Sequence, residues 1–315
     1  ALKAELEKRF DLAVELADCD PAVDPPIMLQ NNPFSAPVEG VLESFGLPGR
    51  GEVDPCTVMS VFYYVLFGLM LSDAAYGLLM VIGCGFALLK FKNMESGMRK
   101  TLQMFFYCGI STTFWGFMFG SFFGDLVGVV ATTFFGRPDI ALGPIWFEPV
   151  KEPMRMLVFS MLMGIIHLFA GLAMKAYQYA KQKAWLDILY DVGFWYMLLA
   201  GLVVFALSNQ MFVGILQLSF ILPVLAGTIR IAVAGIGAVG ILLTAGRESR
   251  SPFKRLLKGA YGLYGVTGYL SDILSYSRLL ALGLATGVIA TVVNSMGSML
   301  GGGIVGAIVF ILVFF

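Results

Sequence analysis

The sequence predicts an all-α fold, a polytopic membrane bundle of about eight transmembrane helices with long, tilted helices near its C-terminus. Of its 315 residues, 58% are hydrophobic and only 13% are charged. The apolar residues form runs of about 17 or more, which is the length that a helix needs to cross a bilayer. The apolar runs predict the lipid bilayer as a partner, and the 21 basic and 21 acidic residues cancel, so net charge predicts no nucleic-acid partner.

The chain divides into three expected regions. Residues 1–18 carry apolar side chains at helical spacing among charges, which predicts the end of a cytoplasmic helical arm. Residues 19–56 are rich in Pro, Gly and Asn and predict an irregular cytoplasmic connector. Residues 57–315 predict the membrane domain, with spans at 57–71, 73–90, 101–134, 154–175, 187–207, 229–245, 259–296 and 300–315, and a further apolar piece at 209–226.

Three features of this layout follow from the pattern. The first pair of spans could instead form one long helix, because almost no turn separates them. The run 300–315 ends without a polar flank, so we expect this span to be truncated. The amphipathic pattern at 1–18 resembles the end of a longer helix, so we expect the arm to begin before Ala1. Lys and Arg gather after the second, fourth and sixth spans, so the positive-inside rule puts both chain ends in the cytoplasm. In a prokaryote the membrane would be the cell membrane.

The most informative residue is Arg278, which lies inside the apolar run 259–296. A guanidinium keeps its charge in proteins, and at the centre of a bilayer it costs roughly 2.5–3.5 kcal/mol on insertion scales. An acidic partner must therefore face it, either in this chain, where Asp272 or Asp73 would give a static pair, or on another subunit. The run is about 38 residues and about 57 Å long against a hydrocarbon core of about 30 Å, so it must tilt, kink at a glycine or project into water.

Other polar residues in the spans are weaker candidates. Asp272 lies about 120° round the helix from Arg278, which favours a place along a polar route over direct pairing. Asp73 and Asp125 either line an aqueous entry on the outer side or sit at helix ends. His167 favours a neutral imidazole hydrogen-bonded to a neighbouring helix over a proton relay. Glycine at every fourth position from 116 to 128 predicts a ridge for close helix packing.

The sequence predicts no cofactor and no metal. The four cysteines are far apart, and the chain has no phosphate-binding loop. The glycine pattern at 235–240 lies inside an apolar span, so it predicts helix packing and not dinucleotide binding. Any catalytic ATP site must therefore lie on another chain.

Several strings resemble one family. The string GYLSDILSYSRLLALGLATGVIA at 268–290 resembles the seventh membrane helix of the stator subunit of V/A-type rotary ATPases, called subunit I in prokaryotes and subunit a in eukaryotes. Further similar strings occur in the same order along nearly the whole chain, namely NNPF at 31–34, GLP at 46–48, EVDP at 52–55, FGLMLSDAAYGLL at 67–79, GSFFGD at 120–125 and GIIH at 164–167.

This resemblance implies a mechanism and partners. The subunit would face a rotating ring of membrane hairpins of the c or K type, offer two offset half-channels for H⁺ or Na⁺, and reach peripheral stalk subunits through its missing arm. The family's essential arginine falls on Arg278, opposite the ring carboxylates, and Asp272, Ser275 and Tyr276 are carried over as lining groups. The departures are the missing arm and the end of the last helix, so one half-channel would be incomplete.

Two other functions stay open from the residues alone. A self-contained secondary transporter would enclose Arg278 with an acidic partner between structural repeats, and the sequence shows no convincing repeat. A structural membrane anchor would make Arg278 dispensable.

Overall fold

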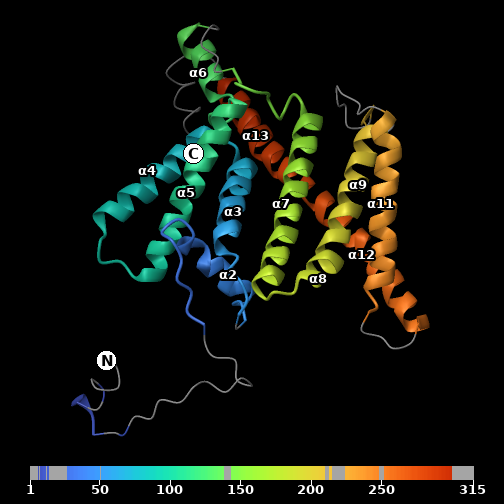
Figure 1. Ribbon diagram of the computed structural model, residues 1–315. Coiled ribbons are helices and arrows are strands. Elements are labelled where there is room, and N and C mark those ends of the chain that lie inside the picture. The colour runs from blue at the N-terminus through green and yellow to red at the C-terminus, as the bar shows by residue number, and fades with distance from the viewer. Residues whose placement is uncertain are drawn as a thin grey trace.

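The computed structural model describes residues 6, 8–11, 13, 27–49, 51–137, 143–209, 213–214, 224–247 and 252–299. Within these ranges the fold is all-α, as predicted, and contains no β-strand (Figure 1). Most of the expected arm at 1–18, most of the apolar piece at 209–226 and the whole expected span at 300–315 lie outside the described residues.

The helices coincide with most of the apolar runs, and two of the expected spans are each divided into two helices. Their order is η1 (Ala36–Val38), α2 (Glu39–Phe45), α3 (Cys56–Leu71), α4 (Ala74–Lys90), α5 (Ser96–Phe119), α6 (Leu126–Phe135), α7 (Pro153–Lys181), α8 (Trp185–Ile188), the π-helical η2 (Leu189–Gly193), α9 (Phe194–Ser208), α11 (Val224–Thr244), α12 (Pro252–Ser275) and α13 (Ser277–Ser298). Three helical stretches in the described part are long and apolar enough to cross a membrane: Pro153–Lys181, Trp185–Ser208 and Phe253–Ser298.

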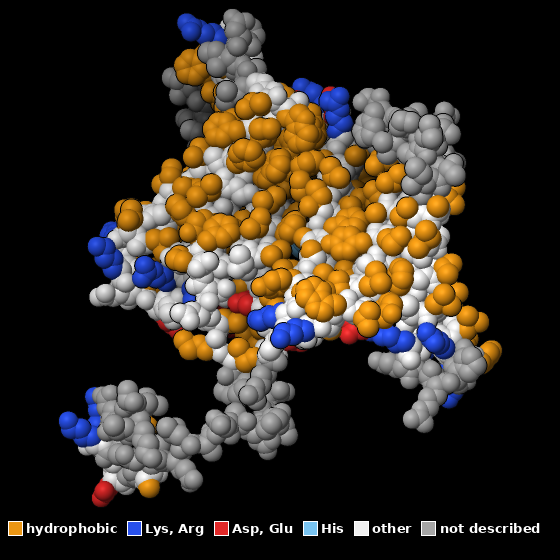
Figure 2. Space-filling model, in the orientation of Figure 1, with side chains coloured by type: hydrophobic (Ala, Val, Ile, Leu, Met, Phe, Trp, Pro, Cys, Tyr) orange, Lys and Arg blue, Asp and Glu red, His pale blue; other side chains and the backbone are white. Residues whose placement is uncertain are grey.

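The surface agrees with a membrane environment. Many large apolar side chains are exposed, among them Phe86 at 59% and Ile82 at 65% on α4. Figure 2 shows hydrophobic side chains across the middle of the bundle, with Lys and Arg at its margins. A soluble protein would not leave so much apolar surface in water. The chain is therefore a helical membrane protein.

The expected first pair of spans forms two helices and not one. Ser72 ends α3 in the left-handed region, at φ 42°, and Asp73 caps the N-terminus of α4 through its side chain. The side-chain cap satisfies backbone donors that a continuing helix would have paired internally.

The expected single span at 101–134 is interrupted, because α5 ends at Phe119 and α6 begins at Leu126. Gly120 and Gly124 lie in the turn between them with φ of +71° and +69°, a conformation that side chains strain to adopt. The predicted glycine ridge is therefore wrong for these two residues. Gly116 packs within its helix as expected, directly against the backbone of Ala74.

The long expected span at 259–296 breaks at Tyr276 and not at a glycine. Tyr276 separates α12 from α13, and the two helices run obliquely across the other helices (Figure 1). On one side of the break, Tyr269 packs against the core of Leu172, Val192 and Leu199. On the other side, α13 packs against a second core of Leu69, Phe119, Phe147 and Met156. The break thus lies between two packed clusters.

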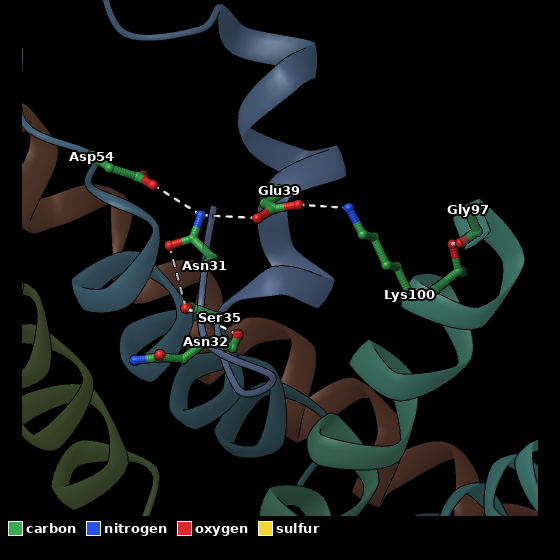
Figure 3. A network of polar contacts seen from close by, with 8 residues as sticks. Asn31, Asn32, Ser35, Glu39, Asp54, Gly97 and Lys100 are labelled. Atoms are coloured by element: carbon green, nitrogen blue, oxygen red, sulfur yellow. Dashed lines mark hydrogen bonds and ion pairs between the residues drawn. The ribbon is translucent and has the colours of Figure 1, made fainter. Parts of the chain in front are cut away.

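The connector is more ordered than its composition predicts. Residues 27–49 include η1 and α2 and pack against α3 and α5, where Val38 is fully buried beside Tyr64 and Cys108. Figure 3 shows the polar contacts that join it to α5. Lys100 lies 2.6 Å from Glu39 Oε2, and Asn31 Nδ2 donates to Glu39 Oε1 at 2.9 Å and to Asp54 Oδ2 at 2.8 Å. These contacts anchor the connector to the helical bundle.

Candidate functional site

Arg278 lies in the first turn of α13 and is exposed. The next two residues, Leu279 and Leu280, pack against the buried core of Leu69, Phe119, Phe147 and Met156. Successive helical residues point about 100° apart, so this packing turns Arg278 away from the core. Within the described part of the chain, no carboxylate forms an ion pair with it.

An open groove of ≈ 480 Å³ surrounds this arginine. We call it the Arg278 groove, and its lining residues come from α3, α7 and the α12–α13 junction: Met70, His167, Leu168, Asp272, Ser275, Tyr276, Arg278, Leu279 and Leu282. The groove therefore brings together five of the residues singled out from the sequence, including His167, which is more than 100 positions earlier in the chain.

His167 and Tyr276 form the best-defined contact in the groove. His167 Nδ1 lies 2.5 Å from Tyr276 Oη, and its ring stacks on Phe62 with centroids 4.3 Å apart. Gly164 leaves room for the Tyr276 ring, because a Cβ there would lie 2.5 Å from Tyr276 Cδ2. The hydrogen bond to a neighbouring helix agrees with the sequence prediction for His167. It also fixes the tyrosine at the helix break.

A second cavity of ≈ 460 Å³ contains Asp73 and Asp125, and we call it the Asp73 pocket. Its walls are the start of α4, the α5–α6 turn, residues 143–151 and the α13 residues Gly283, Thr286, Gly287 and Thr291. Asp73 is 4% exposed. Its carboxylate accepts hydrogen bonds from Ala75 N, Tyr76 N, Ser121 Oγ and Gly124 N at 2.7–3.2 Å.

Asp73 lies at a helix end, which is one of the two expectations from the sequence, and an aqueous entry at this residue stays a prediction. It caps a helix, it holds the α5–α6 turn, and it lies in the wall of a cavity. Asp125 is the residue before α6, yet its side chain caps no backbone donor there. Instead, Asp125 Oδ1 accepts a hydrogen bond from Asn294 Nδ2 of α13 at 2.9 Å.

Sequence reasoning missed Asn294, which is 1% exposed. The available signal was an amide inside an apolar helix, where buried polar groups need partners.

The two cavities lie on consecutive parts of one helix. The Arg278 groove includes α13 as far as Leu282, and the Asp73 pocket begins at Gly283. Arg278 therefore shares no cavity with Asp73 or Asp125. The structure divides the residues singled out from the sequence into two separate polar sites along α13.

These features define a class of protein: a helical membrane protein with a long interrupted helix, an exposed arginine in a polar groove at the break and a second polar cavity farther along the same helix.

Comparison with known proteins gives a family. No protein-family model matches the chain. It is 31% identical over 303 residues to a protein of Methanocaldococcus jannaschii named A-type ATP synthase subunit I, covering 88% of this chain and 41% of that protein. A protein of the same name from Pyrococcus horikoshii is 26% identical over 84% of this chain and 36% of its own length. A V-type ATP synthase subunit I of Borreliella burgdorferi is 24% identical over 80% of this chain and 40% of its own length.

The chain belongs to the V/A-type ATPase subunit I family. It spans about two fifths of the length of these relatives.

Proposed function

We propose that this chain is the membrane part of a rotary-ATPase stator, in which Arg278 faces carboxylates on a rotating ring of c- or K-type membrane hairpins. A fixed cation stabilises an ionised carboxylate that passes in front of it. It also opposes the direct passage of cations from one half-channel to the other. Ion movement of H⁺ or Na⁺ then requires rotation, which couples it to ATP hydrolysis or synthesis on other subunits.

The observation that carries this proposal is the exposure of Arg278 without an acidic partner among the described residues. An arginine at membrane depth needs compensation. Asp272 lines the same groove, yet it forms no ion pair with Arg278. A carboxylate on another subunit would supply the missing partner.

The arrangement of the cavities supports two offset half-channels. The Arg278 groove, with His167, Asp272, Ser275 and Tyr276 in its wall, would form one polar route. The Asp73 pocket, with Asp125, would form part of the other. The two routes meet α13 on successive turns, so an ion would have to be carried past Arg278 by the ring. Basic clusters after α4, α7 and α11 favour a cytoplasmic N-terminus, where the arm would reach the peripheral stalk.

The groove gives less support to a self-contained transporter. Such a protein would enclose its intramembrane charge together with a partner near the midplane. Arg278 is exposed and lies in an open groove, and no carboxylate pairs with it among the described residues.

The test is ATP-driven ion uptake by the assembled complex in vesicles, with and without Na⁺. We expect Arg278→Ala to reduce uptake about a hundredfold or more, the usual cost of removing a pre-organised electrostatic group. Arg278→Lys should keep part of the activity because it keeps the charge. Arg155→Ala is the matched control, since Arg155 pairs with Glu152 outside both cavities. Normal coupled uptake by Arg278→Ala complexes would refute the proposal.

A further inference from the structure

Asn294 joins α13 to the turn between α5 and α6. Its Nδ2 donates to the carbonyl oxygen of Phe123 at 2.8 Å and to Asp125 Oδ1 at 2.9 Å. The Phe123 carbonyl fixes which end of the amide faces the turn, because only the nitrogen end can donate to it. The same nitrogen must therefore face the carboxylate of Asp125.

Burial of the oxygen end of this amide costs folding free energy. Asn294 Oδ1 is buried and has no hydrogen-bond partner among the described residues. A buried acceptor without a donor destabilises a fold, whereas a leucine of similar size would not carry that cost. The two hydrogen bonds that Nδ2 donates to Phe123 and Asp125 must therefore offset this cost, so the donor end of the amide accounts for its presence at this position.

The backbone at this contact is also closely fitted. Gly124 has φ +69°, and a Cβ there would lie 2.8 Å from the Cβ of Ala290 on α13. Gly124 N in turn donates to Asp73 Oδ2 at 3.0 Å. The turn is thus held by hydrogen bonds to Asp73 and to Asn294, and its residues form part of the wall of the Asp73 pocket.

We infer that Asn294 is a positioning residue that fixes the carboxylate of Asp125 in the wall of the Asp73 pocket and ties that wall to the helix carrying Arg278. This inference rests on the proposed ion-translocating function. The titratable groups that line the pocket with Asp125 are Asp73 and Tyr76 of α4 and Glu148 and Lys151 of the segment before α7. α13 contributes hydroxyl groups there and no acid or base.

The test compares Asn294→Asp, Asn294→Leu and the control Ser298→Ala in the assembled complex. Ser298 is partly exposed on the same helix, lies outside both cavities, and among the described residues its hydroxyl bonds the backbone of Ser295. ATP-driven transport is normalised to the amount of assembled complex and measured across pH. We expect Asn294→Leu to lower transport about tenfold at every pH, as removal of a supporting hydrogen bond commonly does. Ser298→Ala should match the unsubstituted protein.

Asn294→Asp keeps the side-chain shape and gives the sharper result. Two adjacent carboxylates hold a shared proton at low pH, which restores a hydrogen bond to Asp125, and they repel each other at higher pH. Its transport relative to the unsubstituted complex should therefore fall as pH rises. A ratio that stays constant across pH would overturn the inference, because mere packing would give that result. Arg278→Ala in the same assay separates the two claims: if it transports normally, the proposed function itself fails.

Discussion

Gly164 provides a direct test of the geometry around the helix break. In Gly164→Ala the new Cβ would lie 2.5 Å from Tyr276 Cδ2 and 2.7 Å from Cγ. Ordinary carbon contacts begin near 3.4 Å, so the ring must retreat by about 1 Å. The ring is not free to do so, because its hydroxyl bonds His167 and the imidazole stacks on Phe62.

The magnitude follows from two opposing terms. Overpacking of this kind costs about 1–3 kcal/mol, and the gain in helix propensity from Gly to Ala offsets roughly 0.5–1 kcal/mol. We therefore expect a net loss of stability between zero and about 2.5 kcal/mol. Because the displaced tyrosine lines the Arg278 groove, transport should fall more steeply, by up to about a hundredfold for a 1 Å displacement.

The assays are thermal unfolding of the purified complex and ATP-driven transport in vesicles. Gly171→Ala is the control, since Gly171 lies on the same helix and a Cβ there meets no atom within 4 Å. It should be neutral or slightly stabilising. If Gly164→Ala and Gly171→Ala behave alike in both assays, Tyr276 does not pack against α7 as described, and the proposed geometry of the groove is wrong.

Two further predictions concern the connector. Lys100→Ala leaves the carboxylate of Glu39, whose side chain is 7% exposed, with Asn31 as its remaining partner, and should destabilise the attachment of the connector by about 1–3 kcal/mol. Limited proteolysis within 27–55 should therefore accelerate, and adding Glu39→Gln should recover part of the loss. Equal proteolysis rates for the single and the double variant would contradict this prediction. Burial raises the pKa of Asp54, but hydrogen bonds from Cys56 and Asn31 outweigh it and hold the pKa below its ordinary value of 3.8. The stability that the Asp54 carboxylate contributes is therefore complete above pH 3.8 and is lost as pH falls below this value. The connector should then open more often at acid pH, so the ratio of its backbone hydrogen exchange to that in Asp54→Asn, which has no carboxylate to protonate, should rise as pH falls.

Hydropathy predicted the helices well where a polar residue marks the end of an apolar run. The expected spans at 73–90 and 154–175 correspond to Ala74–Lys90 and to the first three quarters of Pro153–Lys181. It failed inside 101–134, because Phe122 and Phe123 lie in the turn itself and the apolar run resumes directly after Asp125, so the two helices were predicted as one span. A glycine that packs a helix and one that turns the chain look alike in sequence, and the φ of Gly120 separates them.

The sequence predicted several residues of the candidate sites, but not how these residues group in space. Arg278, Asp73 and His167 stand out because charged and titratable groups are rare in membrane spans. Their distribution between two cavities depends on contacts distant in sequence, such as the bond between His167 and Tyr276. The break at Tyr276 could not be read from the sequence either. Neither glycine nor proline occupies that position, and the break follows from packing on two separate cores.

A second arginine in the same chain shows what internal compensation looks like. Arg247 donates to Asp187 Oδ1 at 2.7 Å and to Asp191 Oδ1 at 3.0 Å, and its guanidinium lies 5.4 Å from the Tyr190 ring centroid. This chain can therefore bring two carboxylates to an arginine that serves its own fold. Arg278 has Asp272 in the same groove and still forms no ion pair among the described residues. A structural arginine would be expected to resemble Arg247, so the contrast favours a partner for Arg278 that moves past it on another subunit.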